Sequence, residues 1–167
     1  ELSPVNPFFR LIDGVLFSAD GRTLVRYPQG RTDKKYVVPN GVEAIADEAF
    51  LHCDLLSSVA LPRELKTVGR KAFAFCQSLT SVALPDGLQT LGAKAFSYCE
   101  SLTSAALPDG LLTLADGTFC GCDSLTSVEL PNGLQSIGDD AFLGCEALSS
   151  IKLPDTLQSI GDDAFRR

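Results

Sequence analysis

The chain has 167 residues, of which 45% are apolar and 21% are charged, so it is suited to one folded domain and is not expected to be disordered. Its formal net charge is −7, which argues against nucleic acid as a partner, because phosphate binding needs a basic surface. The sequence contains no run of about 18 apolar residues, so we expect no membrane insertion.

The first part of the chain is predicted to be a cap. Two Asp-Gly pairs, Asp13-Gly14 and Asp20-Gly21, each lie between short apolar runs. This pattern is a strong signal for a β-hairpin. We therefore expect residues 1–37 to form an N-terminal β-hairpin cap on residues 38–167, the two parts together making one structural domain.

Residues 38–167 repeat themselves every 23 positions. Three residue types recur at that step: Pro39, Pro62, Pro85, Pro108, Pro131 and Pro154; Phe50, Phe73, Phe96, Phe119, Phe142 and Phe165; and Cys53, Cys76, Cys99, Cys122 and Cys145. A fixed period of this length is typical of a solenoid, in which each coil buries its apolar face against its neighbours. The spacing predicts about six coils, of which the last is incomplete.

One copy of the repeat shows what each coil should look like. Residues 79–84 read L-x-x-V-x-L, a pattern that places alternate side chains on one face of a strand. Pro85-Asp86-Gly87 follows as a turn. Residues 93–99 concentrate alanine, phenylalanine and cysteine and are expected to form a short helical turn. The predicted fold is therefore a right-handed α/β solenoid, with a parallel β ladder and short helical turns.

The repeat resembles a known family. The pattern L-x-x-V-x-L-P-(D/N)-G-L-x-x-(I/L)-G-x-x-A-F-x-x-C is similar to the leucine-rich repeats of BspA-like bacterial surface proteins, over about residues 37–165. The resemblance implies a non-catalytic protein-binding or adhesion module of a bacterial secreted or cell-surface protein. A structural spacer that presents another domain is the alternative. Some copies depart from the pattern: Ala46 and Ala115 replace the glycine, which is expected to alter local turns without breaking the stack.

The sequence shows no sign of catalysis or of a cofactor. Its one histidine, His52, cannot form a histidine-based metal site, and no G-x-S-x-G or P-loop motif is present. The cysteines at the 23-residue step are expected to be buried thiols rather than metal ligands, because they point in parallel from successive coils. Cys120 lies off this ladder and is expected to be more exposed. The recurrent aspartates are interpreted as turn formers rather than as a calcium site.

Two surfaces are candidates for partner binding. The first is the outward face of the strands, which we name the serine face: Ser58, Ser81, Ser104, Ser127 and Ser150, with Glu129 and Lys152 expected to pair across adjacent strands. It either docks a flat or extended partner or has no role. The second is the column His52, Phe75 and Tyr98, which is either an exposed aromatic strip or partly buried beside the turn. The ligand, protein or glycan, is left open.

The C-terminal end of the repeat array lacks a cover in this sequence. The chain stops at Phe165-Arg166-Arg167, before the next cysteine and strand would follow. Either the chain is a piece of a longer array, or its open end meets another chain. The second interpretation allows end-to-end self-association.

Overall fold

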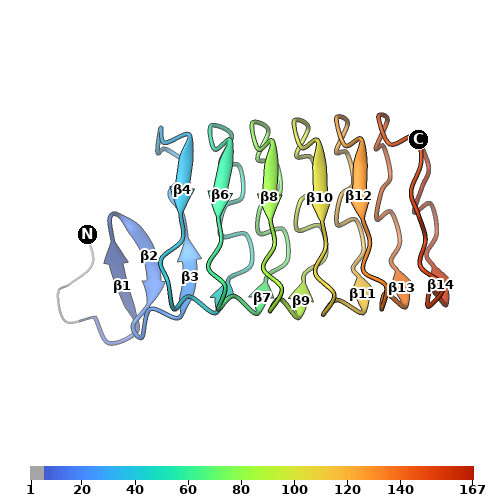
Figure 1. Ribbon diagram of the computed structural model, residues 1–167. Helices are drawn as coiled ribbons and strands as arrows, with labels where there is room; N and C mark the ends of the chain where they lie inside the picture. Colours follow the sequence, from blue (N-terminus) through green and yellow to red (C-terminus); the bar gives the residue numbers. More distant parts are fainter. Residues whose placement is uncertain (1–5) are drawn as a thin grey trace.

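The computed structural model describes residues 6–167 as an elongated stack of coils with a cap at one end and the C-terminus at the other (Figure 1). We number the coils by their phenylalanines: coils 1 to 6 contain Phe50, Phe73, Phe96, Phe119, Phe142 and Phe165. The prediction of a leucine-rich-repeat solenoid of about six coils with parallel strands is confirmed. Residues 6–167 form fourteen short strands and no helix, and so contain no helix long and apolar enough to cross a membrane.

The cap consists of three antiparallel strands: β1 (Phe9–Ile12), β2 (Val15–Ser18) and β3 (Thr23–Arg26). β3 also pairs in parallel with β5, the first strand of the solenoid on that side. The cap therefore continues directly into a solenoid sheet, and no free strand edge separates the two.

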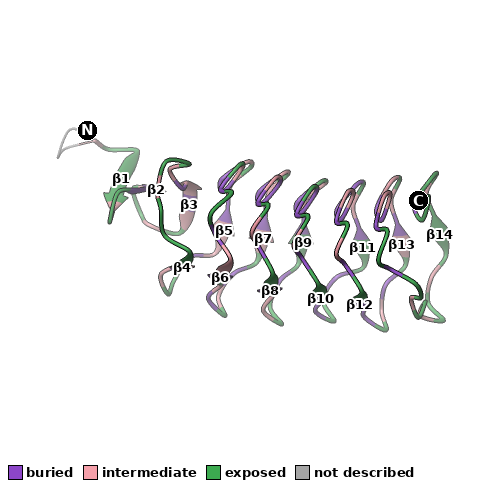
Figure 2. Cartoon of the chain, turned by 90° about the horizontal axis from the view of Figure 1, so that it is seen from above, coloured by how far each residue is buried: buried purple, intermediate pink, exposed green. Residues whose placement is uncertain are grey.

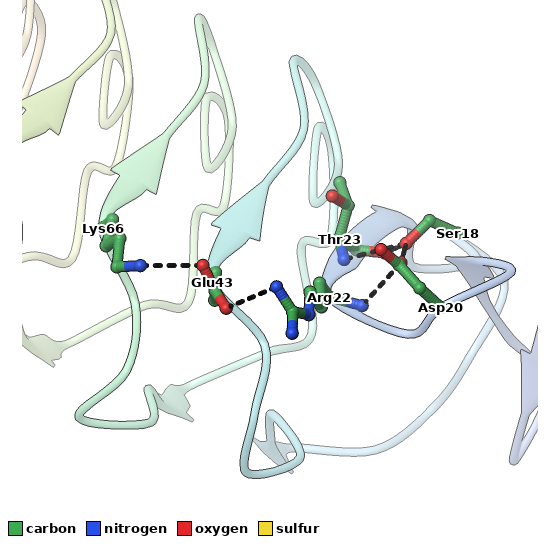
Figure 3. A network of polar contacts seen from close by, with 6 residues as sticks. All are labelled: Ser18, Asp20, Arg22, Thr23, Glu43 and Lys66. Carbon is green, nitrogen blue, oxygen red and sulfur yellow. Dashed lines mark hydrogen bonds and ion pairs between the residues drawn. The ribbon is translucent and has the colours of Figure 1, made fainter.

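A network of polar side chains connects the cap to the first two coils (Figure 3). Ser18 donates a hydrogen bond of 2.6 Å to the carboxylate of Asp20, which also accepts from the backbone N–H of Arg22 at 3.0 Å. The Arg22 guanidinium lies 3.4 Å from Glu43, and Lys66 lies 2.8 Å from the same carboxylate. The hydrogen bond and charge of Lys66 lower the pKa of Glu43 below its ordinary value. Since these groups are exposed to solvent, the network adds little stability, and the pairing of β3 with β5 is what joins the cap to coil 1.

One side of the stack is a five-stranded parallel sheet in the order β12-β10-β8-β6-β4. Its strands are β4 (Lys35–Val37), β6 (Ser58–Ala60), β8 (Ser81–Ala83), β10 (Ser104–Ala106) and β12 (Ser127–Glu129). Residues 23 apart lie opposite each other, as Ser81 does with Ser104. The central residue of the later strands, such as Val82, is buried, and its two neighbours are exposed, because successive side chains on a strand point to opposite faces.

The other side of the stack consists of two-residue strands that form two separate sheets. β5 (Ala44–Ile45), β7 (Thr67–Val68) and β9 (Thr90–Leu91) continue the sheet of the cap. β11 (Thr113–Leu114), β13 (Ser136–Ile137) and β14 (Ser159–Ile160) form a sheet of their own. The pairing on this side is thus interrupted between coils 3 and 4, whereas the other sheet runs through that point.

The expected helical turns are wrong, and the backbone shows why. In coil 1, Glu48 and His52 both adopt left-handed conformations, with φ of 57° and 56°, and two such residues four positions apart prevent a continuous right-handed helix. The N–H groups of this segment instead alternate between two kinds of bond. The N–H of Phe50 donates to the carbonyl of Ala72 in the next coil at 2.7 Å, and the N–H of Leu51 donates locally to Glu48 at 3.1 Å. Half of the bonds that a helix would keep local therefore join neighbouring coils.

The core is a ladder of like residues between the two sides. The phenylalanine rings of coils 1 to 6 stack in sequence, with centroids 4.8–5.7 Å apart and interplanar angles of 5–11°. Tyr27 of the cap stacks on Phe50 at 5.2 Å and closes the ladder at that end. At the other end Phe165 remains 38% exposed. Figure 2 shows the same contrast, because buried residues lie along β5 to β13 and β14 is exposed.

We predict that a phenylalanine inside the ladder contributes far more stability than the one at its end. Phe96→Ala removes a ring packed on both faces and should lower the free energy of unfolding by about 3–5 kcal/mol. Phe165→Ala, which removes a ring packed on one face, should cost about 1 kcal/mol. Urea unfolding followed by circular dichroism measures both values. Equal losses would contradict the ladder as the source of stability.

Candidate functional site

The residues His52, Phe75 and Tyr98 form a second, external stack of rings, which we name the aromatic strip. Their centroids are 4.6 Å apart between His52 and Phe75 and 4.7 Å apart between Phe75 and Tyr98, with interplanar angles of 22° and 11°. His52 is exposed, Phe75 is half-buried and Tyr98 is 43% exposed. The structure thus brings these three predicted residues together on the surface.

The backbone under the aromatic strip is one that glycine prefers. Phe75 and Tyr98 have φ of 61° and 58°, in the left-handed region, which costs a residue with a side chain roughly 1–2 kcal/mol. In coils 4 and 5 the same position is taken by Gly121 and Gly144, with φ of 69° and 72°. Backbone preference alone therefore favours glycine throughout, and the three rings are present against that preference.

The aromatic strip ends at Tyr98, because the equivalent position in the next coil is Gly121, which has no side chain. A Cβ placed on Gly121 would lie 2.6 Å from the Tyr98 ring, so that ring covers the surface which a side chain would occupy. Acidic residues follow the strip at an exposed position two residues after it in four coils: Asp54, Glu100, Asp123 and Glu146. A partner that reaches the strip meets negative charge beside it.

The serine face is flat and built from small side chains. Ser81, Ser104, Ser127 and Ser150 are exposed, and Ser58 is half-buried. The parallel pairing of β6, β8, β10 and β12 holds Ser58, Ser81, Ser104 and Ser127 in one row, whereas Ser150 lies outside the strands. Such a row presents hydroxyl groups on a flat surface. It has none of the large side chains that dominate binding energy at protein interfaces.

The expected pair between Glu129 and Lys152 does not form. Glu129 ends β12, but residues 150–152 belong to no strand in the described part of the chain, so the two residues are not aligned by strand pairing. No salt bridge within residues 6–167 joins them.

The ladder cysteines serve the packing of the coils. Four of the five thiols donate hydrogen bonds of 3.1 Å to phenylalanine carbonyls 26 residues earlier, as Cys76 does to Phe50 and Cys99 to Phe73. All five are buried. Burial raises the pKa of Cys53 and of Cys145 to about 12, so these thiols stay protonated and unreactive.

Cys120 is the partly exposed thiol of the chain. Burial raises its pKa as well, and the neighbouring Tyr98 side chain opposes that shift. The pKa of Tyr98 is raised in turn, chiefly by the charge of the Cys120 thiolate. Cys120 therefore lies beside the end of the aromatic strip.

Thiol labelling should separate Cys120 from the ladder. We predict that a disulfide reagent modifies one thiol in the native protein and six after unfolding in urea, and that Cys120→Ser removes the native reaction. Because the thiolate is the reactive form and the pKa of Cys120 is raised, the native labelling rate should still increase above pH 9. Fast native labelling in Cys120→Ser would contradict the burial of the ladder.

Aspartates join neighbouring coils through their carboxylates, a role that the sequence did not reveal. Asp47 accepts a hydrogen bond of 2.7 Å from the backbone N–H of Arg70, and Asp139 accepts one of 2.8 Å from Asp162. In the part of the chain that the structure describes, no three His, Cys, Asp or Glu residues converge as a metal site would require. The sequence contains one sign of this role: each of these aspartates lies 23 residues, or one repeat, before the residue whose N–H it accepts.

The coils, the parallel sheet and the phenylalanine ladder define a solenoid of 23-residue repeats. The family model described as BspA type leucine rich repeat region matches residues 43–167 in six copies. The chain belongs to this family. A search of curated proteins found no match.

Three solved structures support the same fold. A leucine rich cell surface protein from Faecalibacterium prausnitzii is 35% identical, with a TM-score of 0.82 over 86% of this chain and 39% of that one. A leucine-rich repeat protein from Eubacterium ventriosum is 24% identical, with a TM-score of 0.78 over 98% and 50%. The pneumococcal vaccine antigen PcpA is 24% identical, with a TM-score of 0.73 over 95% and 44%. The chain thus spans half or less of the length of each of these proteins, and the last two show the fold alone.

Proposed function

We propose that the chain is a non-catalytic protein-binding module of a bacterial secreted or cell-surface protein, and that it contacts its partner through the aromatic strip. The family supports a protein-binding or structural repeat module, and the F. prausnitzii relative is itself described as a cell surface protein. The binding partner, the role in adhesion and the secreted or cell-surface location are our proposals beyond the family assignment.

The observation that carries this proposal is the aromatic strip on a backbone suited to glycine. Stacking gains each pair of rings roughly 0.5–1.5 kcal/mol, which is comparable to the cost of the left-handed conformation. Stability therefore gives little reason to keep exposed rings here. Tyrosine is enriched among the residues that dominate binding energy at protein interfaces. Partner recognition therefore explains why the exposed rings are kept.

The geometry of the aromatic strip favours a protein over a glycan. Rings that stack on one another cover each other's faces and present their edges to solvent. Sugars pack their C–H groups on an aromatic face, whereas protein side chains pack on ring edges as well. The acidic residues beside the strip, Glu100 and Asp123 among them, favour a partner segment that carries lysine or arginine.

The alternative is a structural spacer. A spacer has no need of exposed aromatic side chains, and the serine face alone, with its small hydroxyl-bearing residues, would suit that role. The two functions differ in the effect of removing the rings, because a spacer should not lose any binding.

We predict that replacing two rings with glycine abolishes partner binding without loss of stability. Phe75→Gly with Tyr98→Gly copies the residue found at this position in coils 4 and 5, so the backbone keeps its conformation. Wild-type and variant protein would be tested on an array of extracellular matrix proteins and glycans. We expect at least a tenfold loss of affinity for the protein that the wild type binds, a range typical of two contact residues.

Leu11→Ala is the matched control, since Leu11 is 48% exposed on β1 of the cap. This variant should bind like the wild type. Unchanged binding by the double glycine variant would overturn the role of the strip. A wild-type chain that binds nothing on the array, while retaining its fold, would favour the spacer.

We also propose that the exposed C-terminal end associates with a second copy of the chain. Ile160 and Phe165 are 47% and 38% exposed, whereas Ile137 and Phe142, their equivalents one coil earlier, are 2% exposed. A cavity of about 200 Å³ beside Phe142 and Phe165 opens on the same end. Two such ends can cover each other in a dimer with twofold symmetry.

Sedimentation velocity over a range of concentrations tests this association. We expect a concentration-dependent dimer of the wild type, and a monomer when Ile160 and Phe165 are both replaced by Gln, because the polar side chains remove the apolar contact. Leu112→Gln, which changes an exposed leucine in the body of the stack, should leave the dimer intact. A wild type that stays monomeric at every concentration would refute the proposal.

A further inference from the structure

The cap covers one sheet of the solenoid and leaves the first strand of the other sheet open. β3 of the cap pairs with β5, and the hairpin of β1 and β2 continues that sheet past the first coil. In the five-stranded sheet, β4 pairs with β6 alone and is the last strand at the N-terminal end. Within residues 6–167 no strand lies beyond it (Figure 1). One edge of β4, which we name the β4 edge, is therefore free.

Backbone groups on the β4 edge lack the partners that their equivalents have in the next coil. There, the N–H of Ser58 donates to the β4 segment at 3.3 Å, and the carbonyl of Ala60 accepts from that segment at 3.0 Å. One repeat earlier, the equivalent groups are the N–H of Lys35 and the carbonyl of Val37. Among residues 6–167 neither of these groups has a backbone partner. The β4 edge thus presents a donor and an acceptor in the spacing that a further strand would use.

The inward side chain of β4 shows the same missing neighbour. Tyr36 packs against the core and is half-buried, whereas its equivalents Val59 and Val82 are 4% and 6% exposed. The two valines have a neighbouring strand on both sides, and Tyr36 has one on a single side. A side chain of an added strand would cover the part of Tyr36 that is now exposed.

The outward side chains of β4 differ from those of the other strands. Val37 is 71% exposed, and the strands that follow have alanine at this position: Ala60, Ala83 and Ala106. Lys34 and Lys35 are exposed and form no salt bridge within residues 6–167. In a chain of net charge −7, the β4 edge therefore combines an exposed apolar side chain with two unpaired positive charges. These charges favour an acidic partner.

We propose that the β4 edge binds an extended acidic peptide segment of a partner protein, which adds a parallel strand to the sheet. The N–H of Lys35 would donate to a carbonyl of the peptide, and the carbonyl of Val37 would accept from one of its N–H groups. Acidic side chains of the peptide would lie beside Lys34 and Lys35, and an apolar one would lie opposite Val37. In strand addition, main-chain hydrogen bonds supply the affinity and side chains supply the specificity.

A single extended segment fits the β4 edge better than a second copy of the solenoid. The hairpin of β1 and β2 projects two strands past β3, roughly 10 Å at the usual strand spacing. Arg31 joins the turn of this hairpin to the loop before β4 by donating to the carbonyl of Asp13. The hairpin thus takes up space that the body of a second copy would need, whereas one added strand leaves it in place. The site contains no residue of the aromatic strip and is tested independently of it.

The probe is a fluorescent peptide with the sequence Leu-Asp-Glu-Val-Val-Leu. In the register of the solenoid, its two acids lie beside Lys34 and Lys35 and its second valine lies opposite Val37. We expect saturable binding by fluorescence anisotropy. N-methylation of the last leucine removes the donor to the Val37 carbonyl and should weaken binding about tenfold. The peptide Leu-Lys-Lys-Val-Val-Leu should also bind at least about tenfold more weakly, because its charges repel the two lysines.

Val37→Pro tests the main-chain bonds of the β4 edge. The N–H of Val38 donates toward β6 at 3.0 Å, so the N–H of Val37 points to the free edge, since alternate residues of a strand direct their backbone groups to opposite sides. Proline is tolerated where that N–H faces solvent, and we expect at least about a tenfold loss of binding. Val37→Thr is the matched control, which keeps the N–H and a β-branched side chain and should bind like the wild type. Equal binding by the proline variant would overturn the proposal.

A charge reversal tests the preference for an acidic segment. Lys34→Glu with Lys35→Glu changes two exposed side chains and should make the protein bind the lysine peptide more tightly than the acidic one. An unchanged order of the two peptides would overturn the acidic partner. If neither peptide binds the wild type, the lysines only keep other strands away from the edge, and the proposal is wrong.

Hydrogen exchange shows whether the β4 edge is open before the peptide is added. In the free protein, the amides of Lys34 and Lys35 should exchange about 100-fold faster than that of Ser57, which donates to the preceding segment at 2.7 Å, and the acidic peptide should slow them. Protection that rises with protein concentration would assign the edge to a second copy. Protection at every concentration would mean that the edge is already covered. Either result would overturn the proposal.

Discussion

The structure depends on the contact between equivalent residues 23 positions apart. Each coil lies against the next so closely that backbone groups bond across the junction, as the N–H of Phe50 does to Ala72. This spacing places the phenylalanine rings within 4.8–5.7 Å of each other. It also lets four of the ladder cysteine thiols reach a carbonyl of the preceding coil. The core of the solenoid is built from these junctions, so the contacts between neighbouring coils contribute a large part of its stability.

The same constraint explains the irregular places. Glycine is required where two coils approach on the side of the short strands, and Ala115 breaks the pairing there because a methyl group does not fit. The opposite sheet runs unbroken through that junction. The coils therefore stay joined there by that sheet and by backbone bonds such as the one from Lys94 N–H to the Asp116 carbonyl.

The surface divides into parts of different character. The serine face is flat and uniform, whereas the aromatic strip concentrates large side chains in coils 1 to 3 on a backbone that favours glycine. Acidic residues such as Glu100 and Asp123 add negative charge beside the strip. This asymmetry within a regular array is typical of repeat proteins that bind a partner, because the scaffold is fixed by a few positions and the remaining ones are free to vary.

The sequence alone determined the period, the number of coils and the buried residues. Pro39, Phe50 and Cys53 recur at fixed steps, and only a stack places such residues in register. It did not determine the conformation of the turn, because the left-handed φ of His52 and Tyr98 depends on hydrogen bonds to the next coil rather than on their own preferences. Nor did it determine the break in strand pairing between coils 3 and 4: Ala115 was visible as a departure, but its effect depends on the backbone of coil 3, which only the tertiary structure brings beside it.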